Sequence, residues 1–192
     1  MIAFLIIGCE KYINDLQFQA KMCRSNFPDA YVIPVIGNVK TMLPGIYNVN
    51  SPDDYKSLSL KIRSGMSLIL DKLPDVDIIV KIDDDISLDK NQWLLLKTIL
   101  PHVQPDSYIG GGYGNTNGLQ CTDGRNGISS FIHKTKYVYG GLSIFGKKSA
   151  KIIIDNTDLR CDLEDVTAGN TLTNHGHIPT SFGFIVSEKR LL

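Results

Sequence analysis

The sequence lacks any apolar run that approaches the roughly 18 residues needed to cross a membrane. Its apolar opening, residues 2–7, has no basic stretch before it and is followed by Cys9 and Glu10, which argues against a signal peptide. A surplus of either charge is also missing, because 20 Lys and Arg balance 20 Asp and Glu. A general nucleic-acid binder needs a basic surplus to neutralise phosphates. We therefore expect a soluble chain with no transmembrane segment, no nucleic-acid partner and a small ligand.

The sequence has few cysteines and no Cys-x-x-Cys pair. Cys9, Cys23, Cys121 and Cys161 are too few to cross-link a chain of 192 residues, and no Asn-x-Ser/Thr sequon is present. Reduced thiols in a cytoplasmic protein are therefore expected. The composition, with 43% apolar and 21% charged residues, is typical of a globular protein. The length predicts one domain over residues 1–192.

Strand-like and helix-like segments alternate along the first half of the chain. Short apolar or β-branched runs predict strands, and apolar residues three or four positions apart predict helices. In chain order, these segments are strand 2–7, helix 13–23, strand 30–35, helix 58–69, strand 76–82 and helix 91–100. Parallel strands need crossover helices, so the alternation predicts an α/β fold whose central, mostly parallel sheet has helices on both faces.

The second half of the chain has a different pattern. Residues 110–146 are rich in Gly, Asn and Ser and predict long loops. The elements expected within and after these loops are strands at 128–132 and 142–145, helices at 149–156 and 164–173, and a last strand at 180–186.

Three consecutive carboxylates, Asp83, Asp84 and Asp85, directly follow the predicted strand 76–82. Side chains alternate along an extended chain, so Asp83 and Asp85 would point to one side and Asp84 to another. Such carboxylates repel one another unless a cation lies among them. Ligands of parallel sheets bind at the carboxyl ends of strands, so we interpret this turn as a site for Mg²⁺ or Mn²⁺ shared with substrate phosphates. A solvated acidic turn is the alternative interpretation.

Two other carboxylate sites match part of this pattern. A calcium EF-hand loop that began at Asp83 would need Gly at its sixth position and Glu at its twelfth, where the sequence has Leu88 and Leu94. This excludes an EF-hand. A phosphatase of the haloacid-dehalogenase type, with Asp83 as nucleophile and Asp85 as acid, resembles the turn better, although that family usually carries its motif on the first strand. The phosphatase is therefore kept as an alternative function.

Two further segments carry residue types that occur in active sites. Glu164 and Asp165 lie in the first turn of the predicted helix 164–173, where the helix dipole favours negative charge, so capping alone would also explain them. Gly140 and Gly141 lie between aromatic residues. A tight turn would explain this pair, and so would close approach of the backbone to a ligand.

Four segments, taken in order, resemble motifs of the metal-dependent GT-A glycosyltransferases, specifically the β-1,3-galactosyl- and N-acetylglucosaminyltransferase family that includes Fringe. Residues 53–61 resemble its Asp-x-Tyr-x-Asn-Leu-Thr-x-Lys, and residues 79–86 its Val-x-Lys-x-Asp-Asp-Asp-Val. Residues 137–146 resemble its Tyr-x-x-Gly-x-Gly-Tyr-x-x-Ser, and residues 164–169 its Glu-Asp-Val-x-x-Gly. Each motif alone is weak, but their shared order over residues 53–172 is fairly specific.

The resemblance implies a GT-A fold and transfer of a hexose from a UDP-sugar to a hydroxyl of a glycan or glycoprotein. Inversion at the anomeric carbon requires a base, for which we choose Asp165, with Glu164 orienting the base or the sugar. Asp83 and Asp85 would hold Mn²⁺ or Mg²⁺, and Asp83 or Asp84 could also bind the ribose.

The donor would contact residues from several segments. Those expected to bind the nucleotide or the sugar are Ile7, Gly8, Cys9, Asp53, Asp54, Gly140 and Gly141, with Tyr139 beside them. Lys61 and Lys81 could contact the diphosphate, although ordinary structural roles explain them better. Asp123, Arg125 and His133 lie in loops that could select the donor sugar.

The sequence departs from the family pattern at several points. Ser57 replaces an Asn, and Leu142 and Gly146 depart from the glycine motif. A histidine completes the metal site in many GT-A enzymes, and here only His175 and His177 follow the Glu-Asp-Val helix, with His177 chosen as the candidate ligand. Animal members have a membrane anchor that this chain lacks, so we expect a minimal cytoplasmic enzyme of bacterial or viral type, in the latter case within the host cytoplasm. A non-catalytic nucleotide- or carbohydrate-binding module is a second alternative.

Overall fold

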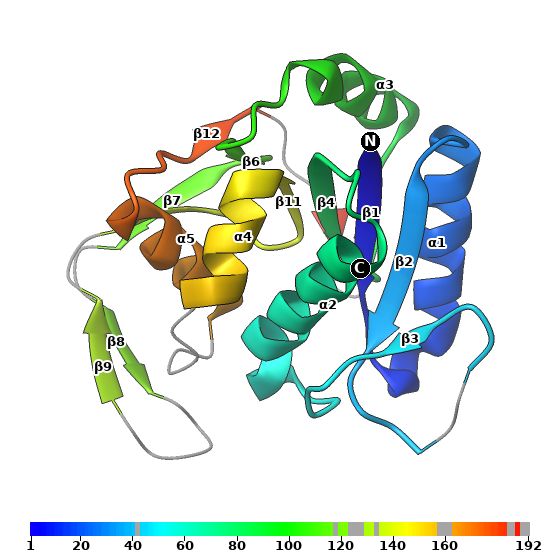
Figure 1. The fold of residues 1–192 in the computed structure, drawn as a ribbon, viewed down its shortest axis with the longest axis horizontal. Helices are drawn as coiled ribbons and strands as arrows, with labels where there is room; N and C mark the ends of the chain where they lie inside the picture. Colours follow the sequence, from blue (N-terminus) through cyan, green and yellow to red (C-terminus); the bar gives the residue numbers. More distant parts are fainter. Residues whose placement is uncertain are drawn as a thin grey trace.

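The computed structural model describes residues 1–40, 43–116, 119–122, 129–132, 135–156, 163–183 and 187–188 (Figure 1). The α-helices in this part of the chain are α1 (Ile13–Asn26), α2 (Leu58–Lys72), α3 (Lys90–Ile99), α4 (Lys147–Asn156) and α5 (Glu164–Asn174). Short 3-10 helices are η1 (Glu10–Tyr12), η2 (Tyr55–Ser57) and η3 (Leu100–His102). Within the described ranges, no helix has the length and apolar character needed to span a membrane.

Local sequence explains where several helices begin. α3 starts at a capping box, because the Asp89 side chain accepts a hydrogen bond from the Gln92 N–H and the Gln92 side chain accepts one from the Asp89 N–H. Asp54 caps η2, the 3-10 turn that leads into α2, because its carboxylate accepts a 2.7 Å hydrogen bond from the Ser57 N–H. These caps fix the helix starts that follow the strand ends.

A seven-stranded sheet forms the centre of the structure. Its strands, in spatial order, are β12 (Thr180–Ser181), β6 (Tyr108–Gly110), β11 (Leu142–Gly146), β4 (Ile78–Asp83), β1 (Ile2–Ile7), β2 (Tyr31–Ile36) and β3 (Tyr47–Asn48). β11 runs antiparallel to both β4 and β6, and the other neighbouring pairs are parallel. The expected mostly parallel α/β sheet is therefore confirmed, and the antiparallel strand at its centre is an addition.

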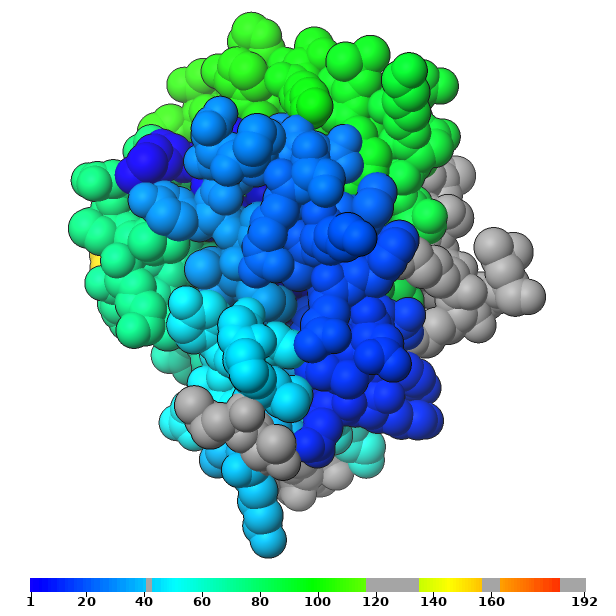
Figure 2. Space-filling view, turned by 90° about the vertical axis from the view of Figure 1, so that its right-hand side faces the viewer, coloured from blue at the N-terminus to red at the C-terminus, as the bar shows by residue number. Residues whose placement is uncertain are grey.

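Helices cover both faces of this sheet, as expected. Along β1, Phe4 and Ile6 point to a core shared with α1 and α3, whereas Leu5 and Ile7 point to a second core shared with α2, α4 and α5. These side chains are almost fully buried. Figure 2 views the molecule from the β2–β3 edge of the sheet, with α3 in green at the top, α1 in blue and α2 in blue-green at the left.

The glycine-rich part of the chain contains more strand than its composition predicts. Strands pair there and near the end of the chain as β7 (Tyr113–Thr116) with β10 (Thr135–Val138), β8 (Leu119–Thr122) with β9 (Ser129–Ile132), and β5 (Ile86–Ser87) with β13 (Ser187–Glu188). Glycine and asparagine are poor strand formers in isolation, so composition favoured loops, and that prediction is wrong at β7, β8 and β10. The strands expected at 128–132 and 142–145 are confirmed by β9 and β11. Of the expected last strand, 180–186, only β12 is a described strand.

The carboxyl ends of β1, β2 and β4 lie at one edge of the sheet, at the bottom of Figure 1. β1 lies between β2 and β4. The chain leaves β1 through α1 on one face and reaches β4 through α2 on the other, so the connections diverge at this point. In open α/β sheets such a divergence creates a crevice outside the strand ends, where ligands bind.

Candidate active site

The acidic turn begins where β4 ends, between the ends of β1 and β11. The Asp83 N–H donates a hydrogen bond to the Gly141 carbonyl, and the Asp84 N–H donates one to the Ile7 carbonyl, each 3.0 Å long. Neighbouring backbones therefore hold the turn on both sides. This places the three carboxylates at the divergence point, as the strand pattern predicts.

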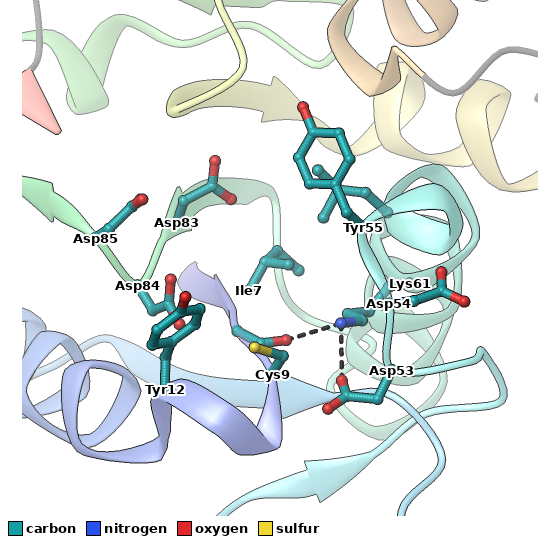
Figure 3. Close-up of a pocket in the computed structure, with 12 residues that line it drawn as sticks. Ile7, Cys9, Tyr12, Asp53, Asp54, Tyr55, Lys61, Asp83, Asp84 and Asp85 are labelled. Carbon is teal, nitrogen blue, oxygen red and sulfur yellow. Dashed lines mark hydrogen bonds and ion pairs between the residues drawn. The ribbon is translucent and has the colours of Figure 1, made fainter. Parts of the chain in front are cut away.

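Alternation along the turn separates the three side chains. Asp83 and Asp85 lie on one side of it, and Asp84 is directed the other way (Figure 3). Asp84 is 4% exposed and packs against Gly8, where any side chain would touch its carboxylate. The orientation of Asp83 and Asp85 agrees with the expectation from the sequence, whereas Asp84 belongs to the wall beneath β1.

Lys81 connects this turn to two other segments. Its side chain is 1% exposed, and its Nζ lies 2.8 Å from Asp83 Oδ1, 2.9 Å from Asp83 Oδ2 and 2.9 Å from Glu164 Oε1. The same Nζ donates a hydrogen bond to the Gly140 carbonyl. Lys81 is thus occupied inside the protein, and its geometry gives no support to a diphosphate contact.

The charges around Lys81 do not cancel. Burial acts to lower the pKa of Lys81, but the carboxylates of Asp83 and Glu164 outweigh it and raise the pKa, so the lysine is a cation. Burial raises the pKa of Asp83 above its usual range, Lys81 opposes that rise, and the negative charges of Glu164 and Asp85 add to it. One ammonium group, that of Lys81, thus faces the two carboxylates of Asp83 and Glu164.

A cavity of about 290 Å³ opens beside the acidic turn, near the lower limit for small-molecule sites (Figure 3). Its walls are Ile7, Gly8, Cys9, Tyr12, Asp53, Asp54, Tyr55, Leu58, Lys61, Asp83, Asp84 and Asp85. The structure thus brings together the predicted donor-site residues except Tyr139, Gly140 and Gly141, and Lys81 hydrogen-bonds the Gly140 carbonyl. Tyr12 and Tyr55, on opposite sides of the cavity, had no predicted role.

A buried ion pair fixes one side of the cavity. Lys61 Nζ donates to Gly8 O and to Asp53 Oδ1, both at 2.9 Å, and Asp53 also accepts 2.7 Å hydrogen bonds from the Gly37 and Glu10 N–H groups. Burial acts to raise the pKa of Asp53, but these hydrogen bonds, with the Lys61 one largest among them, hold it below its usual range. Asp53 therefore ties the ends of β1 and β2 to α2.

These hydrogen bonds argue against a direct donor contact by the carboxylates of two residues that were expected to bind the donor. The Asp53 carboxylate is used on both oxygens by the protein itself, and the Asp54 carboxylate caps η2. Both residues line the cavity. The carboxylates of Asp53 and Asp54 form part of the cavity wall, and those of the acidic turn are placed to bind a cation.

The first turn of α5 lies beside the Gly140–Gly141 turn. Any side chain at Gly140 would overlap Glu164 Oε1, so the Glu164 carboxylate sits directly on the Gly140 backbone. Burial raises the pKa of Asp165 to about 6, the Glu164 charge adds to the rise, and a 2.7 Å hydrogen bond from the Val166 N–H opposes it. Asp165 is therefore a carboxylate of raised basicity that is still ionised at neutral pH.

Two tyrosines of the β10 segment lie on the same side as Asp165. The rings of Tyr137 and Tyr139 meet edge to face with centroids 6.1 Å apart, and they cover Gly114 and Gly112 of the β7 segment. Burial and the nearby Asp165 charge raise the pKa of Tyr137. Tyr139 is 51% exposed. The glycines leave room for these rings against the β7 segment, so an aromatic surface that is half exposed at Tyr139 lies beside α5.

The predicted third metal ligand, His177, lies elsewhere. It is buried, and its Nδ1 is 2.9 Å from Ser149 Oγ and 3.0 Å from the Asp106 carbonyl. Ser149 lies in the first turn of α4, after β11, and Asp106 precedes β6, so both lie at the edge of the sheet opposite Asp83 and Asp85. The structure corrects this prediction, because the chain after α5 turns back to the far edge.

The remaining candidates are His175 as a metal ligand and Asp123, Arg125 and His133 as contacts of the donor sugar. His175 Nδ1 lies 2.8 Å from the Thr171 carbonyl of its own helix. Asp123, Arg125 and His133 lie outside the described residues. In the described part of the chain, no group of three or more His, Cys, Asp or Glu side chains is arranged to hold a metal ion. Any ion at the acidic turn would therefore need ligands from the substrate as well.

Comparison with known families gives one match that spans most of the chain. Residues 45–180 match the family model described as Galactosyltransferase. This range contains the acidic turn, the Gly140–Gly141 turn and α5. No curated protein sequence is significantly similar to the chain.

Solved structures resemble the chain at low identity. A 4-diphosphocytidyl-2C-methyl-D-erythritol synthase is 9% identical, with a TM-score of 0.52 over 96% of this chain and 88% of that one. A putative glucose-1-phosphate thymidylyltransferase from Bacillus anthracis is 10% identical, with a TM-score of 0.51 over 98% of this chain and 89% of that one. These two show a shared fold.

A glycosyltransferase involved in glycosylation of the major capsid of PBCV-1 is 11% identical, with a TM-score of 0.46 over 79% of this chain. The chain spans 63% of the length of that enzyme.

Proposed function

The chain belongs to the galactosyltransferase family and is a glycosyltransferase, and we propose that it moves a hexose from a UDP-sugar to an acceptor hydroxyl in a metal-dependent, inverting reaction. One observation carries this proposal. The cavity that ends at Asp83 to Asp85 and the α5 turn with Glu164 and Asp165 are joined through Lys81 at the carboxyl end of β4. A donor in the cavity would have its sugar directed toward Asp165. UDP is proposed because residues 53–61 and 79–86 resemble motifs of UDP-sugar transferases.

The acidic turn fits a divalent cation. Asp85 offers hard oxygen ligands on the same side of the turn as Asp83, whose two oxygens also contact Lys81 Nζ. Burial, with the Glu164 and Asp85 charges adding to it, raises the pKa of Asp83, and a cation would lower that pKa. Two carboxylates leave positions for donor phosphates, as is usual for Mg²⁺. When bound, Mn²⁺ or Mg²⁺ would neutralise the charge that develops on the leaving diphosphate.

We assign the proton transfer to Asp165. The acceptor oxygen forms a bond to the anomeric carbon, the bond from that carbon to the phosphate oxygen breaks, and UDP leaves with the electron pair. The hydroxyl proton passes to the Asp165 carboxylate, which the neighbouring Glu164 charge and burial make more basic than usual. Glu164 itself is held by Lys81 and serves as the positioning neighbour.

A screen of nucleotide sugars tests this function. With Mn²⁺ present, UDP-sugars should raise the thermal midpoint of the protein more than other nucleotide sugars, and free UDP should be released slowly even without an acceptor. Hydrolysis of an aryl phosphate through a phospho-aspartate at Asp83 would indicate the phosphatase alternative. Stabilisation by UDP-sugars with no turnover under any condition would indicate a non-catalytic binding module.

The open ring of Tyr139 is proposed to contact the acceptor sugar. Tyr139→Ala should raise the acceptor KM by about tenfold with little effect on the donor KM, because Tyr139 directly precedes Gly140, which contacts the α5 turn that carries Asp165, and lies outside the cavity walls. Tyr113→Ala is the matched control, since Tyr113 is 52% exposed on the same hairpin but pairs with Val138, which places it on the other face. Equal acceptor KM values for the two variants would contradict the assignment.

A further inference from the structure

Two lysines at the site edge of the sheet are almost fully buried. The exposed fraction of the side chain is 3% for Lys61 and 1% for Lys81. A buried ammonium group is costly unless it is paired and hydrogen-bonded. Each of these lysines meets that requirement with a carboxylate and with the carbonyl of a loop glycine, Gly8 for Lys61 and Gly140 for Lys81. They are therefore internal cross-links between segments.

The two cross-links serve different halves of the site. Lys61 lines the cavity and joins α2 to the end of β1 through Gly8 and Asp53. Lys81 does not line the cavity. It joins β4 to the first turn of α5 and to the turn before β11. The first contact set belongs to the donor pocket and the second to the side where transfer takes place.

The first turn of α5 depends on this second cross-link. Leu163, at the N-cap, provides no side-chain cap. Glu164 is clamped between Lys81 Nζ, at 2.9 Å, and the backbone of Gly140, where no side chain would fit. Asp165 follows Glu164 in the same turn, so a shift of Glu164 carries Asp165 with it.

We propose that Lys81 is a positioning residue for the transfer step, which it supports by clamping Glu164 and Gly140 against the end of β4 and so fixing Asp165. The inference rests on the proposed function. It predicts that Lys81 acts on the rate of transfer and that Lys61, by contrast, acts on donor binding.

The test compares Lys81→Met with Lys61→Met at saturating Mn²⁺. Lys81→Met should lower kcat by about 100-fold, because small displacements of a reacting group have effects of that size, and should leave the donor KM within about threefold. Lys61→Met should do the reverse, with a donor KM raised about tenfold and kcat within about threefold, since it loosens Gly8 at the cavity wall. Each variant thus controls for the loss of a buried lysine in the other.

A second variant separates positioning from charge balance and keeps the test valid if Lys81→Met folds poorly. Lys81→Met combined with Glu164→Gln removes one charge of each sign, so no new net charge is left in the site. Its thermal midpoint should return toward the wild-type value while kcat stays low. Recovery of kcat together with stability would overturn the proposal, because Lys81 would then serve only to balance charge.

The outcomes also distinguish this inference from the proposed function. An active wild-type protein whose two lysine variants show the same change in kcat and KM would overturn the role of Lys81 alone. A folded wild-type protein that releases UDP from no UDP-sugar would overturn the proposed function, and the positioning role with it.

Discussion

Asp165→Asn is expected to lower kcat by about 1000-fold while the protein still folds and binds UDP. The amide has nearly the same shape and can still accept the hydrogen bond from the Val166 N–H, but it cannot take the proton of the acceptor hydroxyl. UDP release measured with saturating acceptor gives kcat. Titration calorimetry with UDP and Mn²⁺ gives the nucleotide affinity, which should be unchanged.

Asp155→Asn is the matched control for this variant. It makes the same change of charge on α4, where the Asp155 side chain is 51% exposed and pairs with Lys151. Exposed pairs of this kind contribute little to stability, so the control should keep full activity. Normal transfer by a folded Asp165→Asn protein that binds UDP would remove Asp165 from the mechanism.

The pH profile gives a separate check on the same residue. Burial, with the Glu164 charge adding to it, raises the pKa of Asp165 to about 6, and a base works only when it is deprotonated. In the wild-type protein, kcat/KM should therefore fall on the acid side of that pH, and Asp165→Asn should lose this limb. Measurements at saturating Mn²⁺ separate the effect from proton competition at the metal ligands.

Asp85→Asn is expected to reduce UDP affinity in Mn²⁺ to the value that the wild-type protein shows in EDTA, and to lower activity by about 100-fold or more. Asp85 lines the cavity on the same side of the turn as Asp83, and an amide is a weaker ligand than a carboxylate for a hard cation. Titration calorimetry of UDP with Mn²⁺ and with EDTA measures both affinities.

Asp75→Asn provides the comparison for Asp85. Asp75 is exposed and precedes β4 at the opposite edge of the sheet, so Asp75→Asn removes the same negative charge far from the cavity. Its UDP affinity in Mn²⁺ should equal that of the wild type. A wild-type protein that binds UDP equally well with Mn²⁺ and with EDTA would contradict the proposed role of Asp85.

Much of the site edge could be predicted from local sequence. The apolar run that becomes β4 ends in three carboxylates, and parallel strands of this kind end at a shared edge, so the proximity of Asp83 to the end of β1 followed from the strand pattern alone. The alternation of Phe4 and Leu5 between two cores likewise follows from the period of a strand. These features depend on neighbours in the chain or on general rules of sheet geometry.

Contacts between residues far apart in the chain could not be predicted from the sequence. Lys81 and Glu164 are 83 positions apart, and nothing in the spacing of either shows that they meet. The antiparallel insertion of β11 beside β4 brings them together. His177 was misplaced for the same reason, because its position depends on where the chain runs after α5. Nothing in the sequence predicted that Tyr12 would line the cavity, apart from its position shortly after β1.

The pairing of β6 with β11 determines how freely the chain between these two strands can vary. Gly110 lies opposite Ser143, so the end of β6 and the start of β11 are adjacent points in the sheet, close to the acidic turn. The entropy of closing a loop rises only slowly with its length, so the chain between these points can change in length at little cost to the sheet, provided that the contacts of Val138, Gly140 and Gly141 are kept. Tyr137 and Tyr139 lie on this part of the chain, near its return to the sheet. Under the proposed function, exchanging the part of this segment that precedes Val138 is a route to a new acceptor preference.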